Sequence, residues 1–228
     1  MNEAVQPGWR VVMSTEMRQL WLGWKGPLLL FAFSLFLSVN IALLANDPEI
    51  NESSHPKIIN LTINEIVLAG SVMAVLLGAN AFSGERDRQS LESLLLTPTS
   101  RGQLVFGKLL AVLSLWLGMV PIAIPYVLLA SQGTAIVTES LLVLLILGTC
   151  IVWLSAGLGI LVSGLAPTNM ASFAASFVVM AILAFPTQLP AQVQDLPAVR
   201  WFVVMNPYTA LTKYQSAIII DGEPWTSK

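Results

Sequence analysis

The chain has 228 residues, of which 55% are hydrophobic and 11% are charged, with a formal net charge of −2 at pH 7. Soluble domains carry about 25% charged residues, so this composition excludes an ordinary soluble protein and predicts an integral membrane protein. The one cysteine, Cys150, lies inside an apolar stretch, which excludes a disulfide framework.

The first predicted element is an amphipathic helix over residues 7–25. Basic and polar residues occupy one face, and Glu16 lies near the edge of the other. That other face is apolar and holds Trp9, Val12, Met13, Met17, Leu20, Trp21 and Trp24. Tryptophans opposite basic residues are typical of a helix in the membrane interface. Two interpretations stay open: a membrane anchor, or an elbow helix that also contacts a cytoplasmic partner.

Five apolar stretches follow, at residues 27–45, 66–82, 104–130, 141–164 and 170–187. Each is near the length of about 20 residues with which a helix crosses a bilayer. Pro121 and Pro125 predict a kink in the third stretch. The expected fold class is therefore all-α, a polytopic membrane protein in which residues 1–228 form one transmembrane domain.

The distribution of Lys and Arg predicts the orientation of these spans. Basic residues gather before the first span and around the loop of residues 84–103, whereas the loop of residues 46–64 has only Lys57 and the loop of residues 131–140 has none. Cytoplasmic loops carry an excess of Lys and Arg. We therefore expect the N-terminus and the 84–103 loop on the cytoplasmic side, and the other two loops outside.

Residues 188–228 form the segment that follows the fifth span, and we expect it outside. Residues 208–220 have apolar side chains at helical spacing but are too few to cross the bilayer. This stretch is expected to lie in the outer interface or to form a shallow re-entrant helix. The chain ends at Lys228, and we expect that it is truncated or ends before a sixth span.

The most distinctive stretch is GERDRQSLESLLLTPTSRGQLVFGK, at residues 84–108. Arg88 and Glu92 have the i,i+4 spacing of a helical ion pair. The same short helix is expected to present an apolar ridge formed by Leu91, Leu94 and Leu95. Such a ridge among charges suits a groove on another protein, but the leucines alone are equally consistent with contact to lipid headgroups.

Residues 102–108, GQLVFGK, match part of a phosphate-binding loop. Leu109 follows where that loop needs Ser or Thr for Mg²⁺, and no strand precedes it. We therefore expect no nucleotide site in this chain, and we expect Lys108 to extend to the inner headgroups.

No Asp, Glu, Arg or Lys lies at clear membrane depth, since Glu65, Lys108 and Glu139 are near span ends. This absence argues against a proton- or sodium-coupled transporter. Asn80 is the main polar exception, and it either hydrogen-bonds across helices or lines a path. Close helix packing is predicted for the small residues of the fourth span, Ser155, Gly157, Gly159 and Ser163.

His55 is the only histidine, and it lies in a predicted loop. A nucleophile paired with histidine and a metal site of several histidines are therefore excluded within the membrane. The chain is not expected to be catalytic, and we expect no cofactor and no nucleic-acid partner.

The stretch FSGERDRQSLESLLLTPTSRGQLVFGKLLA resembles the permeases of type-2 ATP-binding-cassette exporters. The positions that match the family's pattern are Glu85-Arg86, Ser90-Leu91-Glu92, Leu94-Leu95, Pro98, Ser100-Arg101 and Gly107-Lys108. Gln89 departs from the pattern, because the family usually has Gly there. The helix at residues 7–25, the order of the spans and Asn206-Pro207-Tyr208 resemble the family too.

The resemblance implies the membrane-spanning subunit of an exporter in the bacterial cytoplasmic membrane, with six spans in the usual family fold. It implies a separate ATP-binding-cassette ATPase subunit and a second permease copy, identical or related, as partners. The expected surface for the ATPase is Glu85, Arg86, Leu91, Glu92, Leu94 and Leu95, in the coupling loop of residues 84–103. The rivals are a non-catalytic membrane scaffold or assembly factor, and an intramembrane enzyme, which the missing catalytic residues disfavour.

Overall fold

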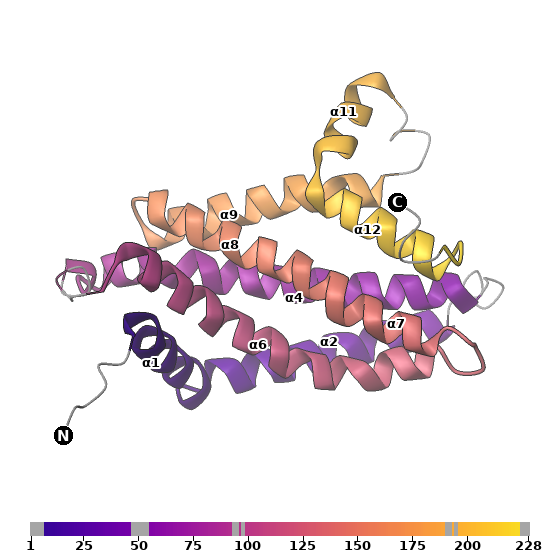
Figure 1. Cartoon of the computed structure of the whole chain (residues 1–228), viewed down its shortest axis with the longest axis horizontal. Coiled ribbons are helices and arrows are strands. Elements are labelled where there is room, and N and C mark those ends of the chain that lie inside the picture. Colours follow the sequence, from indigo (N-terminus) through magenta and orange to yellow (C-terminus); the bar gives the residue numbers. More distant parts are fainter. Residues whose placement is uncertain are drawn as a thin grey trace. The chain divides into compact units, whose positions relative to one another are not determined.

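A computed structural model of the chain describes residues 7–46, 55–92, 96, 99–189, 193 and 196–223. The regular elements within these ranges are all helices (Figure 1). Five helical segments among the described residues are long and apolar enough to cross a membrane. The expected all-α polytopic fold is therefore confirmed.

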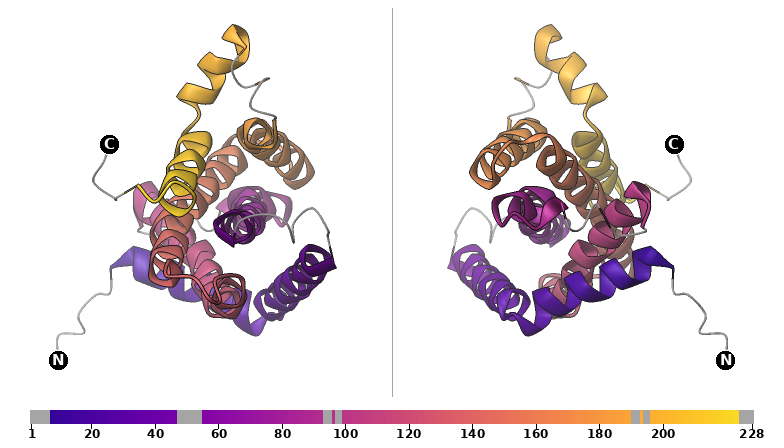
Figure 2. Two further views of the ribbon diagram at one scale, coloured as in Figure 1. Left: turned by 90° about the vertical axis from the view of Figure 1, so that its right-hand side faces the viewer. Right: turned by 90° about the vertical axis from the view of Figure 1, so that its left-hand side faces the viewer.

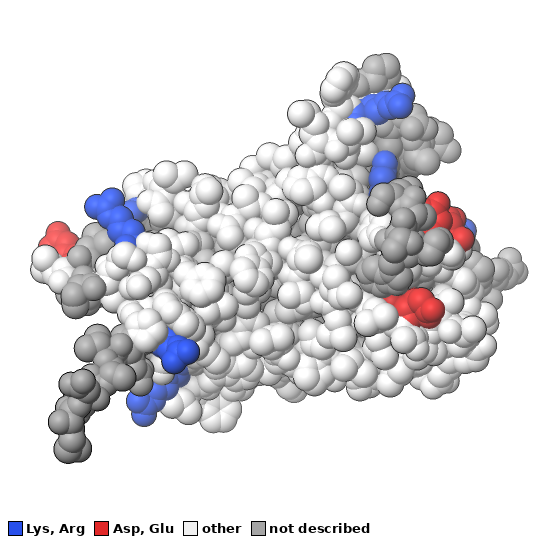
Figure 3. All heavy atoms as spheres, in the orientation of Figure 1, with Lys and Arg blue, Asp and Glu red and all other residues white. Residues whose placement is uncertain are grey.

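The elements in chain order are α1 (Gly8–Leu22), α2 (Lys25–Asn46), α4 (His55–Asp87), α6 (Arg101–Ala130), α7 (Val137–Val143), the π-helix η1 (Leu144–Gly148), α8 (Thr149–Leu165), α9 (Asn169–Ala184), the 3-10 helix η2 (Phe185–Gln188), α11 (Pro197–Met205) and α12 (Pro207–Ile219). The candidate spans are Lys25–Leu44, His55–Asp87, Arg101–Ala130, Val137–Leu165 and Asn169–Thr187. Both Pro121 and Pro125 lie inside α6. On the face drawn in Figure 3, charged side chains lie toward the ends of the long helices and uncharged atoms cover the stretches between them.

α4 begins earlier than the sequence predicts. Residues 55–64 were expected in a loop, but they form the first turns of α4. Ile59 and Ile63, four residues apart, are fully buried, so this polar-looking stretch has a buried helical face. As a consequence Glu65 lies well inside α4 and not at its start.

Contacts divide the chain into two compact units, and each is described separately. Unit 1 comprises Met1–Ala32, Ser71–Gly118 and Val152–Val178, and unit 2 comprises Phe33–Gly70, Met119–Ile151 and Val179–Lys228. Unit 1 contains α1 and the loop between α4 and α6, so it holds the expected functional residues.

Glycines bring α4 and α8 close together in unit 1. A Cβ atom added to Gly159 would lie 2.5 Å from the carbonyl oxygen of Val75, and one added to Gly78 would lie 2.8 Å from that of Ala156. Real Cβ atoms do not approach backbone so closely, so both positions require glycine. The predicted close packing is confirmed at Gly159, whereas Gly157 faces open space.

α1 runs across the direction of α4, since Figure 2 shows α1 lengthwise where α4 is seen end-on. Part of its apolar face packs on α6. The Trp21 indole N–H donates to Ser114 Oγ at 3.1 Å, and the Trp9 ring meets the Phe106 ring edge-on at 5.8 Å. Trp24, after the end of α1, is 79% exposed. The tryptophans of the expected interfacial face thus have two environments.

In unit 2, α12 packs against α4 through buried polar side chains. The Gln215 amide donates to Asn60 Oδ1 at 3.0 Å and to Asn64 Oδ1 at 3.1 Å. Asn206 caps α12 by accepting from the N–H groups of Tyr208 and Thr209. The helix expected near residues 208–220 is present, and one of its faces is covered by protein.

Candidate functional site

The end of α4 in unit 1 positions the expected site residues. α4 ends at Asp87, and Gln89 adopts a positive φ of 57°. The N–H of Gln89 donates to Arg86 O, and that of Ser90 donates to Glu85 O, both at 3.0 Å. These two hydrogen bonds, together with the left-handed conformation of Gln89, form a Schellman motif. This motif turns the chain sharply away from the helix axis.

This turn separates Arg88 from Glu92. The two residues were expected one turn apart on the same helix, but the left-handed Gln89 lies between them and a new helical stretch includes Leu91 and Glu92. The predicted i,i+4 pair is therefore wrong. Glycine adopts this backbone conformation at least cost, which accounts physically for the glycine that the resembled family has at the position of Gln89.

Arg86 and Asp87 hold the turn between α8 and α9. The Arg86 guanidinium donates to the carbonyl oxygens of Ala166 and, at 3.3 Å, of Gly164. The Asp87 carboxylate accepts from the N–H of Asn169 at 3.1 Å, at the start of α9. A carboxylate is stabilised there by the free N–H groups of the first helical turn.

Glu85 belongs to a charge cluster that also contains the buried Lys108 and the half-buried Glu16. The Lys108 ammonium lies 2.7 Å from Glu85 Oε1 and also bonds Glu16 Oε1. Only 2% of the Lys108 side chain is exposed. The expectation that Lys108 extends to the headgroups is therefore wrong. Two carboxylates from α4 and α1 hold it inside unit 1, because a buried charge must be paired.

The ammonium of Lys108 also lies 5.4 Å from the centre of the Phe82 ring, within the range of a cation–π contact. Glu85 Oε2 is buried and has no hydrogen-bond partner among the described residues. The cluster thus joins α1, α4 and α6 through one cation.

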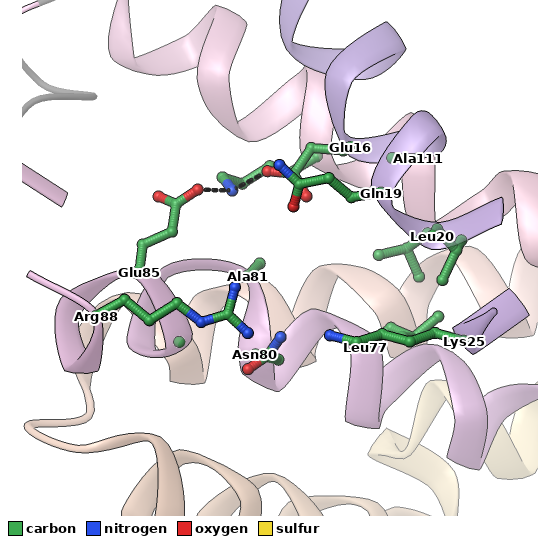
Figure 4. A pocket seen from close by; sticks show the side chains of 13 residues that line it. Glu16, Gln19, Leu20, Lys25, Leu77, Asn80, Ala81, Glu85, Arg88 and Ala111 are labelled. Carbon is green, nitrogen blue, oxygen red and sulfur yellow. Dashed lines mark hydrogen bonds and ion pairs between the residues drawn. The ribbon is translucent and has the colours of Figure 1, made fainter. Parts of the chain in front are cut away.

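A cavity of about 100 Å³ lies beside this cluster (Figure 4). Its polar lining consists of Glu16, Gln19, Lys25, Asn80, Glu85, Arg88 and Lys108. Asn80 lies in the cavity wall, and a Cβ atom added at Gly84 would collide with its side chain. In the part of the chain that the structure describes, no three His, Cys, Asp or Glu residues are placed to hold a metal ion.

The expected apolar ridge is only partly described. Leu91 is half-buried, Glu92 is exposed and the neighbouring Leu96 is 85% exposed, whereas Leu94, Leu95 and Pro98 lie outside the described residues. Glu85 and Arg86 lie in the same helical turn, but Glu85 pairs with Lys108 whereas Arg86 donates to the carbonyl oxygen of Ala166.

Sequence reasoning missed the partnership of Glu16 and Lys108. A signal for it was present, since Glu16 is an acidic residue beside an apolar helix face. A carboxylate in that position needs a cation brought by another element.

A family model described as ABC-2 family transporter protein matches residues 27–220. No match was found among curated proteins. The matched range covers most of the chain, including the four later spans, the charge cluster residues Glu85 and Lys108, and α12. The chain therefore belongs to the ABC-2 transporter family, whose members are membrane components of ATP-binding-cassette transporters.

Proposed function

We propose that this chain is the membrane-spanning subunit of an exporter and that its α4–α6 connection receives motion from a separate ATPase subunit. The observation that carries the proposal is the pair Glu85 and Arg86. Glu85 ties the end of α4 to α6 and α1 through Lys108, and Arg86 ties it to the turn between α8 and α9. A displacement of this short segment therefore acts on several helices of unit 1 at once.

The docking surface would be formed by Leu91, Glu92, Leu94 and Leu95. An apolar ridge with charges beside it fits a groove on a folded partner. The loop would face the cytoplasm, in keeping with the excess of Lys and Arg that cytoplasmic loops carry. A second permease copy, identical or related, would complete the transport path. Closure of the ATPase subunits on ATP would bring the two coupling loops together and switch access from one side to the other.

The test is a pull-down of the detergent-solubilised chain with its candidate ATPase. Leu94→Asp/Leu95→Asp places two charges on the ridge and should abolish binding. Leu196→Asp is a matched control, because Leu196 is exposed and lies in the segment expected outside. It should bind the ATPase as the wild type does.

Equal binding by the wild type and the double variant would remove the ridge from the interface. Failure of the wild type to bind a correctly chosen ATPase would favour the rival function, a membrane scaffold that docks another cytoplasmic protein. Each variant should elute as a single species in detergent. Such an elution excludes misfolding as the cause of lost binding.

A further inference from the structure

Two basic side chains, Lys25 and Arg88, line the cavity of unit 1. Among the described residues neither side chain has a hydrogen bond or an ion pair, in contrast to Lys108 with its two carboxylates. In Figure 4 both extend toward Asn80, one from either side of it in this view. The two positive charges attract an anion to the space between them, beside the Asn80 amide.

The position of these residues along the spans indicates where the anion comes from. Lys25 is the first residue of the first span, and Arg88 follows directly after the end of the second. The ends of spanning helices lie at the depth of the lipid headgroups, and basic residues there attract anionic headgroups. The cavity therefore opens where phosphate groups of the bilayer are concentrated.

The size of the cavity limits the ligand to one small group. Binding sites for drug-sized molecules measure about 300–1,000 Å³, whereas this cavity measures about 100 Å³. It has no room for a nucleotide or a whole substrate. A phosphate-sized group fits, with any attached chains outside.

The charges that line the cavity match a single anion. Lys25, Arg88 and Lys108 contribute three positive charges and Glu16 and Glu85 two negative ones, so the sum is 3 − 2 = +1. The two carboxylates are turned to Lys108, which leaves the outer cations for a ligand. Apolar side chains of the same wall, including Leu20, Leu77 and Val112, suit the glycerol and upper chain carbons of a lipid.

We propose that this cavity binds the phosphodiester of a phospholipid headgroup, held by Arg88 and Lys25, with the Asn80 amide as a further donor. The ligand is a component of the bilayer, and the site joins α1, α2, α4 and the start of α6 around it. The proposal does not depend on the ATPase, and it stands if the coupling role of the 84–103 loop fails.

The experiment measures the affinity of the detergent-solubilised full chain for the first bound lipid by native mass spectrometry. The probes are phosphatidylglycerol and, as a phosphate-free control, diacylglycerol with the same acyl chains. Arg88→Gln and Lys25→Gln should each lower the affinity for phosphatidylglycerol by about fivefold, the effect of one basic residue at a lipid surface. Arg18→Gln removes an exposed cation of α1 that does not line the cavity, and it should leave the affinity unchanged.

Arg88→Lys keeps the positive charge and should retain most of the affinity, which separates loss of charge from loss of fold. Equal affinities in the wild type, Arg88→Gln and Lys25→Gln would overturn the proposal, as would equal binding of diacylglycerol. Inorganic phosphate is the last probe. If phosphate in the same concentration range displaces phosphatidylglycerol, the site prefers a free ion and the lipid source is wrong.

Discussion

The ammonium nitrogen of Lys108 lies 2.7 Å from Glu85 Oε1, and the lysine side chain is 2% exposed. A lysine at the mouth of a membrane span ordinarily extends its charge to the water. Here the charge stays inside because Glu85 and Glu16 reach it from two other helices. The ion cluster is thus a connection between elements that are far apart in the sequence, and its members should be energetically dependent on one another.

Lys108→Met tests this dependence. The substitution keeps an unbranched apolar side chain, one heavy atom shorter than lysine, but leaves the carboxylates of Glu16 and Glu85 without a cation. Removing one partner of a buried ion pair costs about 3–5 kcal/mol, so the melting temperature of the detergent-solubilised protein should fall. Tryptophan fluorescence during heating measures it. Lys213→Met is the control, since Lys213 is exposed on α12, and it should melt as the wild type does.

Neutralising all three side chains provides the second arm of this test. The combination of Lys108→Met with Glu16→Gln and Glu85→Gln removes the unpaired charges, and buried ion clusters are often replaced by neutral groups at little cost. It should recover most of the lost melting temperature. If the triple variant were as unstable as Lys108→Met alone, the loss would come from packing and not from charge.

Gln89→Gly should stabilise the end of α4. Gln89 has a φ of 57°, and a residue with a Cβ atom pays about 1–2 kcal/mol there relative to the right-handed region. Glycine removes that penalty, but it loses more conformational entropy on folding than glutamine does. The net gain in the free energy of unfolding is therefore about 1 kcal/mol or less. Thermal melting measures it. Gln103→Gly, the same substitution within α6, should destabilise. A loss of stability in both variants would show that Gln89 makes contacts worth more than its strain.

The five spans could be predicted from the sequence because the length of an apolar stretch is a local property. The start of α4 could not, because Asn60 and Asn64 read as loop residues until their partner is known. That partner, Gln215, lies 155 and 151 positions away. Lys108 and Glu16 are likewise 92 positions apart. A buried polar residue is recognised from its partner, and one sequence does not show which distant residues meet.

The backbone turn at Gln89 had a partial signal in the sequence. The departure from the glycine of the resembled family marked the position at which the chain bends, but the spacing of Arg88 and Glu92 favoured a continuous helix. The hydrogen bonds from the N–H groups of Gln89 and Ser90 resolve the conflict in favour of the turn. A side-chain pair at i,i+4 is worth only about 0.2–0.5 kcal/mol, too little to impose a helix.

Gly159→Ala should destabilise the protein and Gly157→Ala should not. A Cβ atom at position 159 would lie 2.5 Å from the Val75 carbonyl oxygen, a backbone atom that cannot move without shifting α4. Overpacking of this kind costs about 1–3 kcal/mol. At position 157 the same atom meets nothing within 4 Å, and alanine favours the helix by about 1 kcal/mol. The two melting temperatures should therefore move in opposite directions, and a fall in both would contradict the close approach of α4 and α8.

Arg86→Gln should separate binding of the ATPase from its coupling, if the proposed function holds. Arg86 is occupied by the carbonyl oxygens of Gly164 and Ala166, so its removal should loosen the α8–α9 turn from the end of α4. A hydrogen bond from a charged group contributes about 1.5–3 kcal/mol. The variant should bind the ATPase with unchanged affinity, whereas the stimulation of ATP hydrolysis in the reconstituted complex should fall about tenfold, equivalent to about 1.4 kcal/mol.

Arg200→Gln is the matched control for this experiment, because Arg200 is exposed on α11 and lies in unit 2. It should change neither binding nor hydrolysis. If Arg86→Gln instead abolished binding, Arg86 would belong to the docking surface and the ridge of leucines would not act alone. If the variant kept full stimulation, the tie between Arg86 and the α8–α9 turn would have no part in transmission, and Glu85 with Lys108 and Glu16 would be the remaining connection from the loop to the spans.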